Sequence, residues 1–316
     1  MKIVQIGTGG WGKNHTRILS ELGVLVAICD VNPDKSKEYG EKYSVNNYES
    51  LDELLRSEEF DGAFVVTPTS THTQIAMKLL EARKHVFVEK PMTYKSEDGD
   101  TLTKLAEKNK LILTCGYIER FNPAVDVVKN IVKEKKFGDL VMLEFHRENR
   151  MPLHIKDVGI IYDTSVHDID TANWLFDDMP NVVFARAGKI KHEREDFANI
   201  MLGYKNDKVA IISSNWITPK RVRKFNAVCT DARISSDFIT QEITVEKSEN
   251  SETIQNKKQE PLLLEIQSFL GAIEGKNELI VKSQQAVNVT KIAEAALLSS
   301  QKGIPIYLDL KWIKQW

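Results

Sequence analysis

Short apolar runs alternate with helical patterns over the first 120 residues of the chain. Between the runs, apolar residues at helical spacing predict helices near Trp11–Leu22, Asp34–Lys42, Thr73–Ala82 and Ser96–Lys108. The runs themselves predict strands at Lys2–Ile6, Val24–Cys29, Gly62–Val66, His85–Val88 and Leu111–Thr114. Because these runs are continuously apolar rather than alternating, we expect parallel strands that are covered on both faces. The pattern predicts an α/β fold with a doubly wound parallel sheet.

The pattern changes after about residue 120, which predicts two domains, residues 1–119 and 120–316. Helices are expected at Pro123–Lys135, Tyr162–Phe176, Pro261–Ile273 and Ala286–Gln301. Strands are expected at Leu140–Arg147, Val182–Ala187, Phe197–Tyr204, Val209–Asn215 and Phe225–Thr230. Turn-forming Gly, Asn and Asp residues join the later strands and favour an open antiparallel sheet. The segment Glu246–Glu260 is expected to be an exposed loop or an edge hairpin.

Composition narrows the class of protein. The 316 residues carry 43 Lys and Arg against 45 Asp and Glu, a formal net charge of −2. This balance argues against nucleic acid or a membrane surface as a partner, because both need a basic excess. No run of about 18 apolar residues occurs, and MKIVQIGTGG has no signal-peptide pattern. We therefore expect a cytoplasmic protein.

The three cysteines are Cys29, Cys115 and Cys229. Their odd number, their wide spacing and the lack of a CxxC or Cys/His pattern argue against a disulfide framework or structural zinc. We expect buried, reduced thiols and no metal.

A glycine-rich segment, Gly7-Thr8-Gly9-Gly10-Trp11-Gly12, matches G-x-G-x-x-G between the first strand and the first helix. Gly7 permits the tight turn, Gly9 lets the backbone approach a pyrophosphate, and Gly12 allows close packing of helix on strand. The pyrophosphate would lie on the N-terminus of the helix that begins near Trp11. The segment predicts a dinucleotide-binding Rossmann domain with cofactor contacts from Gly7, Gly9, Gly10, Trp11 and Gly12. The alternative is a glycine-rich turn that binds nothing.

Asp30 ends the second strand, 21 positions after Gly9. A carboxylate there accepts hydrogen bonds from an adenosine ribose and repels a 2′-phosphate. We therefore expect NAD rather than NADP as the cofactor, unless Asp30 only caps a loop.

Two further loops follow strands at the carboxyl edge, where doubly wound sheets bind ligands. In Glu89-Lys90-Pro91, the lysine can pair with a substrate hydroxyl or transfer a proton, although a solvated surface lysine is the alternative. Thr67, Pro68 and His72 follow the preceding strand and are expected on the nicotinamide side, although His72 can equally cap the next helix. We include Thr67, Pro68, His72, Glu89 and Lys90 among the cofactor-binding candidates.

A carboxylate and a histidine, Asp163 and His167, lie four positions apart on a predicted helix and share one face. A carboxylate beside an imidazole orients it and favours its protonated form, which makes the imidazole a better proton acceptor. The alternative is a helix with polar residues on a solvated face.

The segments GTGGWG, TPTSTH, EKP and the D-x-x-x-H pair in DTSVHDID occur in the order seen in the Gfo/Idh/MocA oxidoreductases, and the chain resembles that family over nearly its whole length. The resemblance implies a Rossmann domain followed by an α/β domain with a mostly antiparallel open sheet. It also implies that Lys90 and His167 flank the reacting carbon and that Asp163 assists. The chain departs from the family where DVGIIY replaces a Gly-rich stretch before Asp163. Within the family, GYIERFNP, KDVG and NWITPKRVR are most similar to UDP-N-acetylglucosamine 3-dehydrogenases and their uronate relatives.

These features predict an NAD-dependent dehydrogenase of a sugar secondary alcohol, at C3 of a UDP-N-acetylhexosamine. His167 would accept the hydroxyl proton, oriented by Asp163, and Lys90 would stabilise the charge that develops on the oxygen, although Lys90 and His167 can exchange roles. One alternative is a dehydrogenase of a free sugar or cyclitol. Another is a non-catalytic regulator that senses NAD and sugar, which would not need all three residues.

A basic cluster within NWITPKRVRK suggests that the substrate carries phosphate. Arginine suits bidentate phosphate binding, and Trp216 can lie against a flat group. The alternative is a solvated basic strand end. The cluster comprises Lys220, Arg221, Arg223 and Lys224, and we take Arg120, Lys156, Trp216, Arg221 and Arg223 as substrate contacts together with Lys90, Asp163 and His167.

The strands of the second domain carry apolar residues on both faces, as Phe197–Tyr204 and Val209–Trp216 show. Helices of the same domain can cover only one face, so the other needs a partner. We expect a homodimer that packs sheet on sheet, or a homotetramer, unless Glu246–Glu260 folds back over that face.

Overall fold

The computed structural model describes residues 1–152 and 155–308, and the chain packs as two units. The first unit contains Met1–Gly116 and Leu262–Val287, and the second contains Tyr117–Pro261 and the chain from Asn288. The sequence placed the division between residues 119 and 120 and gave everything beyond it to the second domain. Instead, the chain divides after Gly116, and Leu262–Val287 returns to the first unit.

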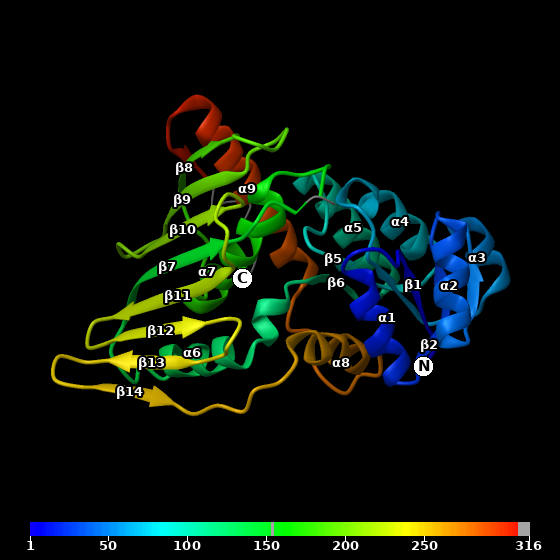
Figure 1. The fold of residues 1–316 in the computed structure, drawn as a ribbon, viewed down its shortest axis with the longest axis horizontal. Coiled ribbons are helices and arrows are strands. Elements are labelled where there is room, and N and C mark those ends of the chain that lie inside the picture. Colours follow the sequence, from blue (N-terminus) through cyan, green and yellow to red (C-terminus); the bar gives the residue numbers. More distant parts are fainter. Residues whose placement is uncertain (153–154, 309–316) are drawn as a thin grey trace. The chain divides into compact units, whose positions relative to one another are not determined.

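Six parallel strands form the sheet of the first unit in the order β3-β2-β1-β4-β5-β6 (Figure 1). This is the Rossmann order, with its switch point between β1 and β4, and it confirms the predicted doubly wound sheet. The strands are β1 (Ile3–Ile6), β2 (Leu25–Cys29), β3 (Asn46–Tyr48), β4 (Gly62–Val65), β5 (His85–Glu89) and β6 (Leu113–Gly116). The helices between them are α1 (Gly12–Glu21), α2 (Pro33–Tyr43), α3 (Leu51–Ser57), α4 (Thr69–Glu81) and α5 (Ser96–Asn109).

An aromatic cluster explains why a late segment packs with the first unit. Phe64 of β4 and Phe87 of β5 stack with their ring centroids 4.6 Å apart. Phe269 of α8 (Pro261–Ile273) meets Phe64 edge-on at 5.2 Å. Burying one such side chain contributes about 2–3 kcal/mol, so α8 completes the core of the Rossmann unit.

The second unit is built on a nine-stranded sheet in the order β14-β13-β12-β11-β7-β10-β9-β8-β15. Among the described strands of this sheet, only β7 and β10 pair in parallel, which confirms the predicted mostly antiparallel sheet. The β13–β14 hairpin forms one edge, so the segment around Glu246 is the edge hairpin of the two predicted alternatives. The strands are β7 (Leu140–Glu148), β8 (Val182–Gly188), β9 (Phe197–Gly203), β10 (Val209–Asn215), β11 (Val222–Cys229), β12 (Arg233–Asp237), β13 (Ile243–Glu246), β14 (Ser251–Ile254) and β15 (Ile306–Tyr307).

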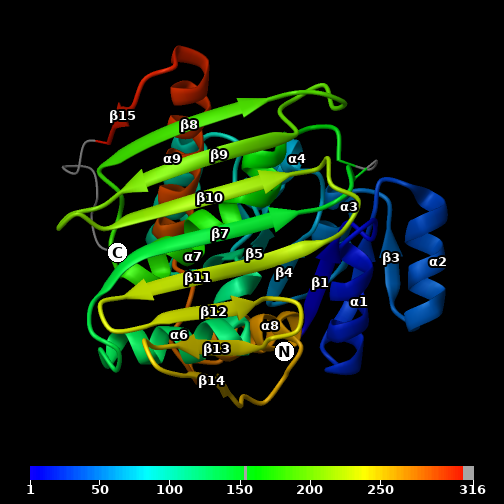
Figure 2. The same cartoon turned by 60° about the vertical axis from the view of Figure 1, so that its left-hand side comes forward.

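Helices cover one face of this sheet (Figure 2). They are α6 (Pro123–Lys133), α7 (Val166–Phe176) and the later part of α9 (Ser283–Lys302). Ser299 of α9 anchors to the sheet, because its Oγ accepts the Ala185 N–H of β8 at 3.0 Å. A 3₁₀ helix, η1 (Ile118–Phe121), precedes α6, and a π-helical turn, η2 (Ile161–Ser165), leads into α7. Among the described residues of this unit, no helix lies over the other face.

The three cysteines are buried, as predicted, and none forms a disulfide among residues 1–152 and 155–308. In the same residues, no helix combines the length and apolar character needed to cross a membrane.

Candidate active site

The glycine-rich loop joins β1 to α1 through contacts that leave no room for a side chain at Gly7 or Gly12. Gly7 has φ +90°, and a Cβ there would collide with the Val66 carbonyl. A Cβ on Gly12 would collide with the Gly7 carbonyl. These two glycines therefore allow the tight turn and the close helix packing that a pyrophosphate cradle needs. The first turn of α1 begins at Gly12, and the positive end of a helix dipole favours an anion at such a position.

Gln5, a buried glutamine that the sequence analysis did not predict to have a role, supports this loop through hydrogen bonds. The Gln5 Nε2 donates to the carbonyls of both Gly7 and Gly12 at 2.8 Å. The signal was a polar residue in the middle of the otherwise apolar strand β1. Because the amide bridges the two ends of the turn, Gln5 fixes the shape of the cradle.

Asp30 lies at the end of β2, as predicted, and also ties the loop to α2. Its Oδ2 accepts the Thr8 N–H at 2.8 Å and the Thr8 hydroxyl at 2.7 Å. Its Oδ1 accepts the Asn32 N–H at 3.0 Å. The carboxylate therefore holds the glycine-rich loop, and its remaining lone pairs can accept ribose hydroxyls.

Lys35 is a second residue that the sequence reasoning missed. Its ammonium lies 3.5 Å from the position a Cβ would take on Gly9. Asn32 caps α2 by accepting the Lys35 N–H at 3.2 Å, so the lysine belongs to the first turn of that helix. A cation thus lies beside the glycine at which the backbone is expected to approach a pyrophosphate.

Glu89 connects the loop to the end of β5. Its Oε1 accepts the Trp11 indole N–H at 3.0 Å and lies 2.8 Å from His15 Nε2, while its Oε2 accepts the Lys90 N–H at 3.0 Å. Burial acts to raise the pKa of Glu89, but the hydrogen bond and charge of His15 lower it overall. Trp11 and Glu89, both predicted as cofactor contacts, thus hold each other, and Glu89 positions the backbone of Lys90.

His72 is buried in the first turn of α4, which begins at Thr69 rather than at Thr73. Its Nδ1 lies 2.9 Å from the Pro91 carbonyl and its Nε2 lies 2.8 Å from the Thr67 carbonyl. The two readings left open for His72 were the nicotinamide side and a helix cap. In the structure, His72 connects the loops that follow β4 and β5, which lie at the carboxyl edge of the sheet.

In the second unit, Asp163 lies in the π-helical turn η2 and His167 lies at the start of α7. His167 is 9% exposed, and Asp163 is partly exposed. Asp163 Oδ2 accepts the Thr164 hydroxyl at 3.0 Å. The predicted pair is therefore held about one helical turn apart on a single rigid segment. Extra-residue turns of this kind occur frequently at functional sites.

Two buried arginines, Arg147 and Arg120, form three ion pairs beside α7. Arg147 of β7 binds Asp168 through Nη2 at 2.8 Å and Glu119 through Nη1 at 3.0 Å. Arg120 of η1 binds Asp170 through Nη2 at 2.6 Å. Burial raises the pKa of Asp168 and of Asp170, opposed in each case by the arginine partner. These contacts fix α7 to the elements beneath it.

Two predicted substrate contacts need correction. The Arg120 side chain has no exposed surface, because it binds Asp170 and covers the Trp174 ring at 4.6 Å. Trp216 is 3% exposed and donates its indole N–H to the Thr164 hydroxyl at 3.2 Å. Both residues therefore hold the site together and offer no free surface to a substrate.

Three of the predicted substrate contacts are basic residues whose side chains keep accessible surface. Lys156 and Arg221 are exposed, and Arg223 of β11 is partly buried. Burial, and then the charge of Arg147, lower the pKa of Arg223 to about 10. A guanidinium under this repulsion would gain from a bound anion.

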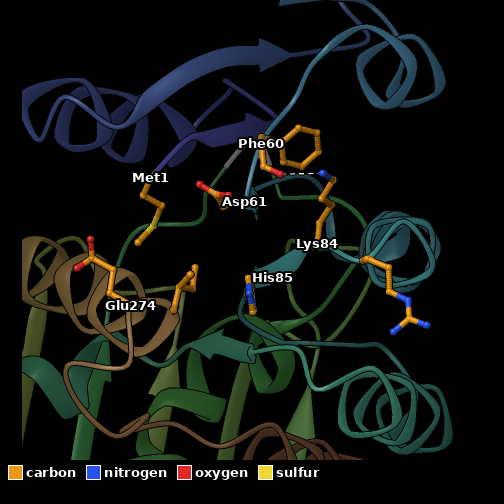
Figure 3. Close-up of a pocket in the computed structure, with 8 residues that line it drawn as sticks. Met1, Phe60, Asp61, Lys84, His85 and Glu274 are labelled. Carbon is orange, nitrogen blue, oxygen red and sulfur yellow. Dashed lines mark hydrogen bonds between the residues drawn. The ribbon is translucent and has the colours of Figure 1, made fainter.

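The pocket in Figure 3 lies elsewhere in the first unit, lined in part by Met1, Phe60, Asp61, Lys84, His85 and Glu274. His85 begins β5, so this pocket is at the amino ends of the strands, whereas doubly wound folds bind ligands at the carboxyl ends. Lys84 Nζ is engaged by the Phe60 carbonyl at 2.7 Å. This pocket therefore does not belong to the cofactor site.

The Rossmann unit with its glycine-rich cradle and the second unit with its carboxylate–histidine pair define a two-domain, dinucleotide-dependent oxidoreductase. A family model described as "Oxidoreductase family, NAD-binding Rossmann fold" matches residues 1–117. A second, described as "GFO/IDH/MocA C-terminal domain", matches residues 125–235. The chain belongs to the Gfo/Idh/MocA oxidoreductases. This confirms the predicted family and the predicted NAD cofactor. It also confirms the prediction of an enzyme rather than the alternative of a non-catalytic regulator.

Similar proteins share most of the chain at low identity. A UDP-N-acetylglucosamine 3-dehydrogenase of Acidithiobacillus ferrooxidans is 26% identical over 86% of this chain and 88% of its own. A myo-inositol 2-dehydrogenase of Thermotoga maritima is 28% identical over 68% of each chain. A solved structure of the Acidithiobacillus enzyme superposes with a TM-score of 0.88 at 25% identity, covering 96% of this chain and 98% of that one.

Asp30→Ala should weaken NAD binding about tenfold, because the ribose loses a charged acceptor and Thr8 is released. Binding of NADP should weaken less, because the carboxylate that repels a 2′-phosphate is gone. Calorimetric titration of each cofactor measures both affinities. Asp34→Ala, an exposed aspartate in the first turn of α2, is the matched control. Tighter binding of NADP than of NAD by the wild-type protein would contradict the assignment to Asp30.

Proposed function

We propose that this protein oxidises a secondary alcohol of a nucleotide-linked sugar, at C3 of a UDP-N-acetylhexosamine. The observation that carries the proposal is the Asp163–His167 pair, held on one helical segment by buried contacts of α7. The similarity to a UDP-N-acetylglucosamine 3-dehydrogenase over 86% of the chain supports the choice of substrate.

In this reaction, His167 accepts the proton of the substrate hydroxyl, and Asp163 orients the imidazole and stabilises its charged form. Lys90 donates a hydrogen bond to the same oxygen and stabilises the negative charge that develops there. Lys90 and His167 can exchange these two roles. When bound, NAD supplies the hydride acceptor. The glycine-rich loop, Asp30 and Lys35 would hold the cofactor, and the product is the ketone.

A cyclitol or free sugar is the second candidate substrate. The myo-inositol 2-dehydrogenase that is 28% identical over 68% of this chain favours it. The same proton-transfer residues would serve either substrate, because both present a secondary alcohol. A UDP-sugar carries phosphates, whereas a cyclitol or free sugar does not, so recognition of phosphate distinguishes the two candidate substrates.

Incubation with NAD and a panel of UDP-sugars, free sugars and cyclitols should give NADH absorbance with a UDP-N-acetylhexosamine, and mass spectrometry should show loss of two hydrogens. His167→Ala should lower kcat at least about a hundredfold and leave the affinity for NAD unchanged. His85→Asn, at the other end of the parallel strands, is the control. Near-normal turnover by His167→Ala would remove that residue from the mechanism.

We propose that Arg223 contacts the phosphates of the substrate. Arg223→Ala should then raise the KM for a UDP-sugar about tenfold, the loss of one charge-assisted contact. The affinity for NAD should stay unchanged. Lys205→Ala, an exposed lysine in the turn after β9, is the control. If the KM stays the same in Arg223→Ala and in single alanine variants of Lys220, Arg221 and Lys224, the basic cluster is only a solvated strand end.

We also propose that the uncovered face of the second sheet joins two copies of the chain. Met201 of β9 and Ile211 of β10 are directly paired there and are 46% and 41% exposed. The alternative cover, Glu246–Glu260, contributes β14 to the sheet edge rather than lying over the face. A symmetric homodimer buries this surface, and doubling it gives a tetramer.

Sedimentation at micromolar concentration should give at least twice the chain mass of 35.9 kDa. Ile211→Lys should shift the protein towards the monomer, because it places a charge in the apolar interface. Ile239→Lys, at an exposed position outside the strands, should leave the mass unchanged. A wild-type species near 35.9 kDa would refute the dimer.

A further inference from the structure

The Asp163 carboxylate is the end point of two consecutive hydrogen bonds within the second unit. The indole N–H of Trp216 donates to Thr164 Oγ1 at 3.2 Å, and the Thr164 hydroxyl donates to Asp163 Oδ2 at 3.0 Å. We propose that Thr164 and Trp216 are positioning residues, which fix the orientation of the carboxylate that orients His167. This inference rests on the role given to Asp163 in the proposed function.

The chemistry of the three groups fixes the direction of both bonds. An indole N–H can only donate, so the Thr164 oxygen must accept from Trp216. The single hydrogen of that hydroxyl is then directed to Asp163, whose ionised carboxylate can only accept. Consecutive hydrogen bonds of this kind polarise and strengthen one another. Without the indole, the hydroxyl could rotate away and leave the carboxylate without this donor.

Trp216 is itself held rigidly at the end of β10. Its backbone N–H donates to the Asp196 carbonyl at 2.8 Å, and its ring meets His192 edge-on at 5.4 Å. The Asp196 carboxylate accepts three consecutive backbone N–H groups, from Ile190, Lys191 and His192. The loop between β8 and β9 is therefore held by its own hydrogen bonds, and the Trp216 indole packs against it.

The same loop holds the π-helical turn from its other end. The Glu195 carbonyl accepts the Ile160 N–H at 2.9 Å, and its carboxylate accepts the Ile161 N–H at 3.4 Å. A Cβ on Gly159 would meet that carboxylate, so a side chain there would have to displace the Glu195 carboxylate. The turn that contains Asp163 is thus fixed at its start by Glu195, and Thr164 holds the Asp163 carboxylate itself.

The hydrogen bonds can be tested without a substrate. The chain has five tryptophans, so the Trp216 indole N–H signal is readily assigned by its loss in Trp216→Phe. Thr164→Val should move this signal upfield and speed its exchange with solvent, whereas Thr164→Ser should keep both. Asp163→Asn should also shift the signal, although Asp163 does not touch the indole. An indole signal that Thr164→Val leaves unchanged would overturn the inference.

Kinetics test the positioning role. Thr164→Val should lower kcat about tenfold, the effect of one hydrogen bond to a charged group, with the KM and the affinity for NAD unchanged. Trp216→Phe should lower kcat about threefold, by removing the donor that directs the hydroxyl. Thr164→Ser should restore wild-type turnover. Thr218→Val is the control, since the hydroxyl of Thr218 is buried without a hydrogen-bond partner among the described residues.

A double variant separates positioning from loosening of the fold. Because Trp216 acts through Thr164, the double variant Thr164→Val/Trp216→Phe should turn over no more slowly than Thr164→Val alone. Multiplied losses would overturn the inference, and so would an unchanged kcat in Thr164→Val while Asp163→Asn is impaired. Wild-type turnover by Asp163→Asn would instead refute the part of Asp163 in the proposed function.

Discussion

The buried ion pairs of α7 are the constraint on which the second unit depends. Arg147 and Arg120 bring their charges into the interior, where each guanidinium is satisfied by a carboxylate from the opposite element. Removal of one partner from such a pair typically costs about 3–5 kcal/mol, because the other charge is left buried. That cost holds α7 in one position against β7 and η1. A helix held in this way keeps His167, at its start, and Asp163, in the preceding turn η2, in a fixed position.

The first unit uses the same physics around a single carboxylate. Glu89 satisfies Trp11 of the glycine-rich loop, His15 of α1 and the backbone of Lys90 at once. Three segments that are distant in sequence therefore share one acceptor, and none can move without leaving a buried polar group unsatisfied. In both units, a residue given a chemical role follows or precedes a buried carboxylate that is held in place: Lys90 follows Glu89, and His167 precedes Asp168.

The sequence predicted the architecture well where hydrophobicity and local geometry decide it. Continuous apolar runs identified five of the six parallel strands, but β3 is short and lacks an apolar run, so it carried no signal. Motif spacing located Asp30 and the Asp163–His167 pair. What escaped prediction depends on contacts between distant residues: the return of α8 to the first unit, the brace made by His72, and the support from Gln5. The sequence of a motif does not show whether its arginine contacts a ligand or a buried aspartate. For this reason, Arg120 was wrongly predicted to contact the substrate.

The division of labour in the second unit follows from burial. Proton transfer is assigned to residues of α7 and η2. Buried ion pairs hold α7, and hydrogen bonds from Trp216 and to Glu195 hold η2. The residues assigned to substrate recognition, such as Arg221 and Arg223, lie on β11 and the segment before it, with exposed or partly exposed side chains. Substitution at an exposed position such as Arg221 breaks no buried ion pair, so it costs little stability. A chain built in this way can change the substrate it recognises while its proton-transfer groups stay in place.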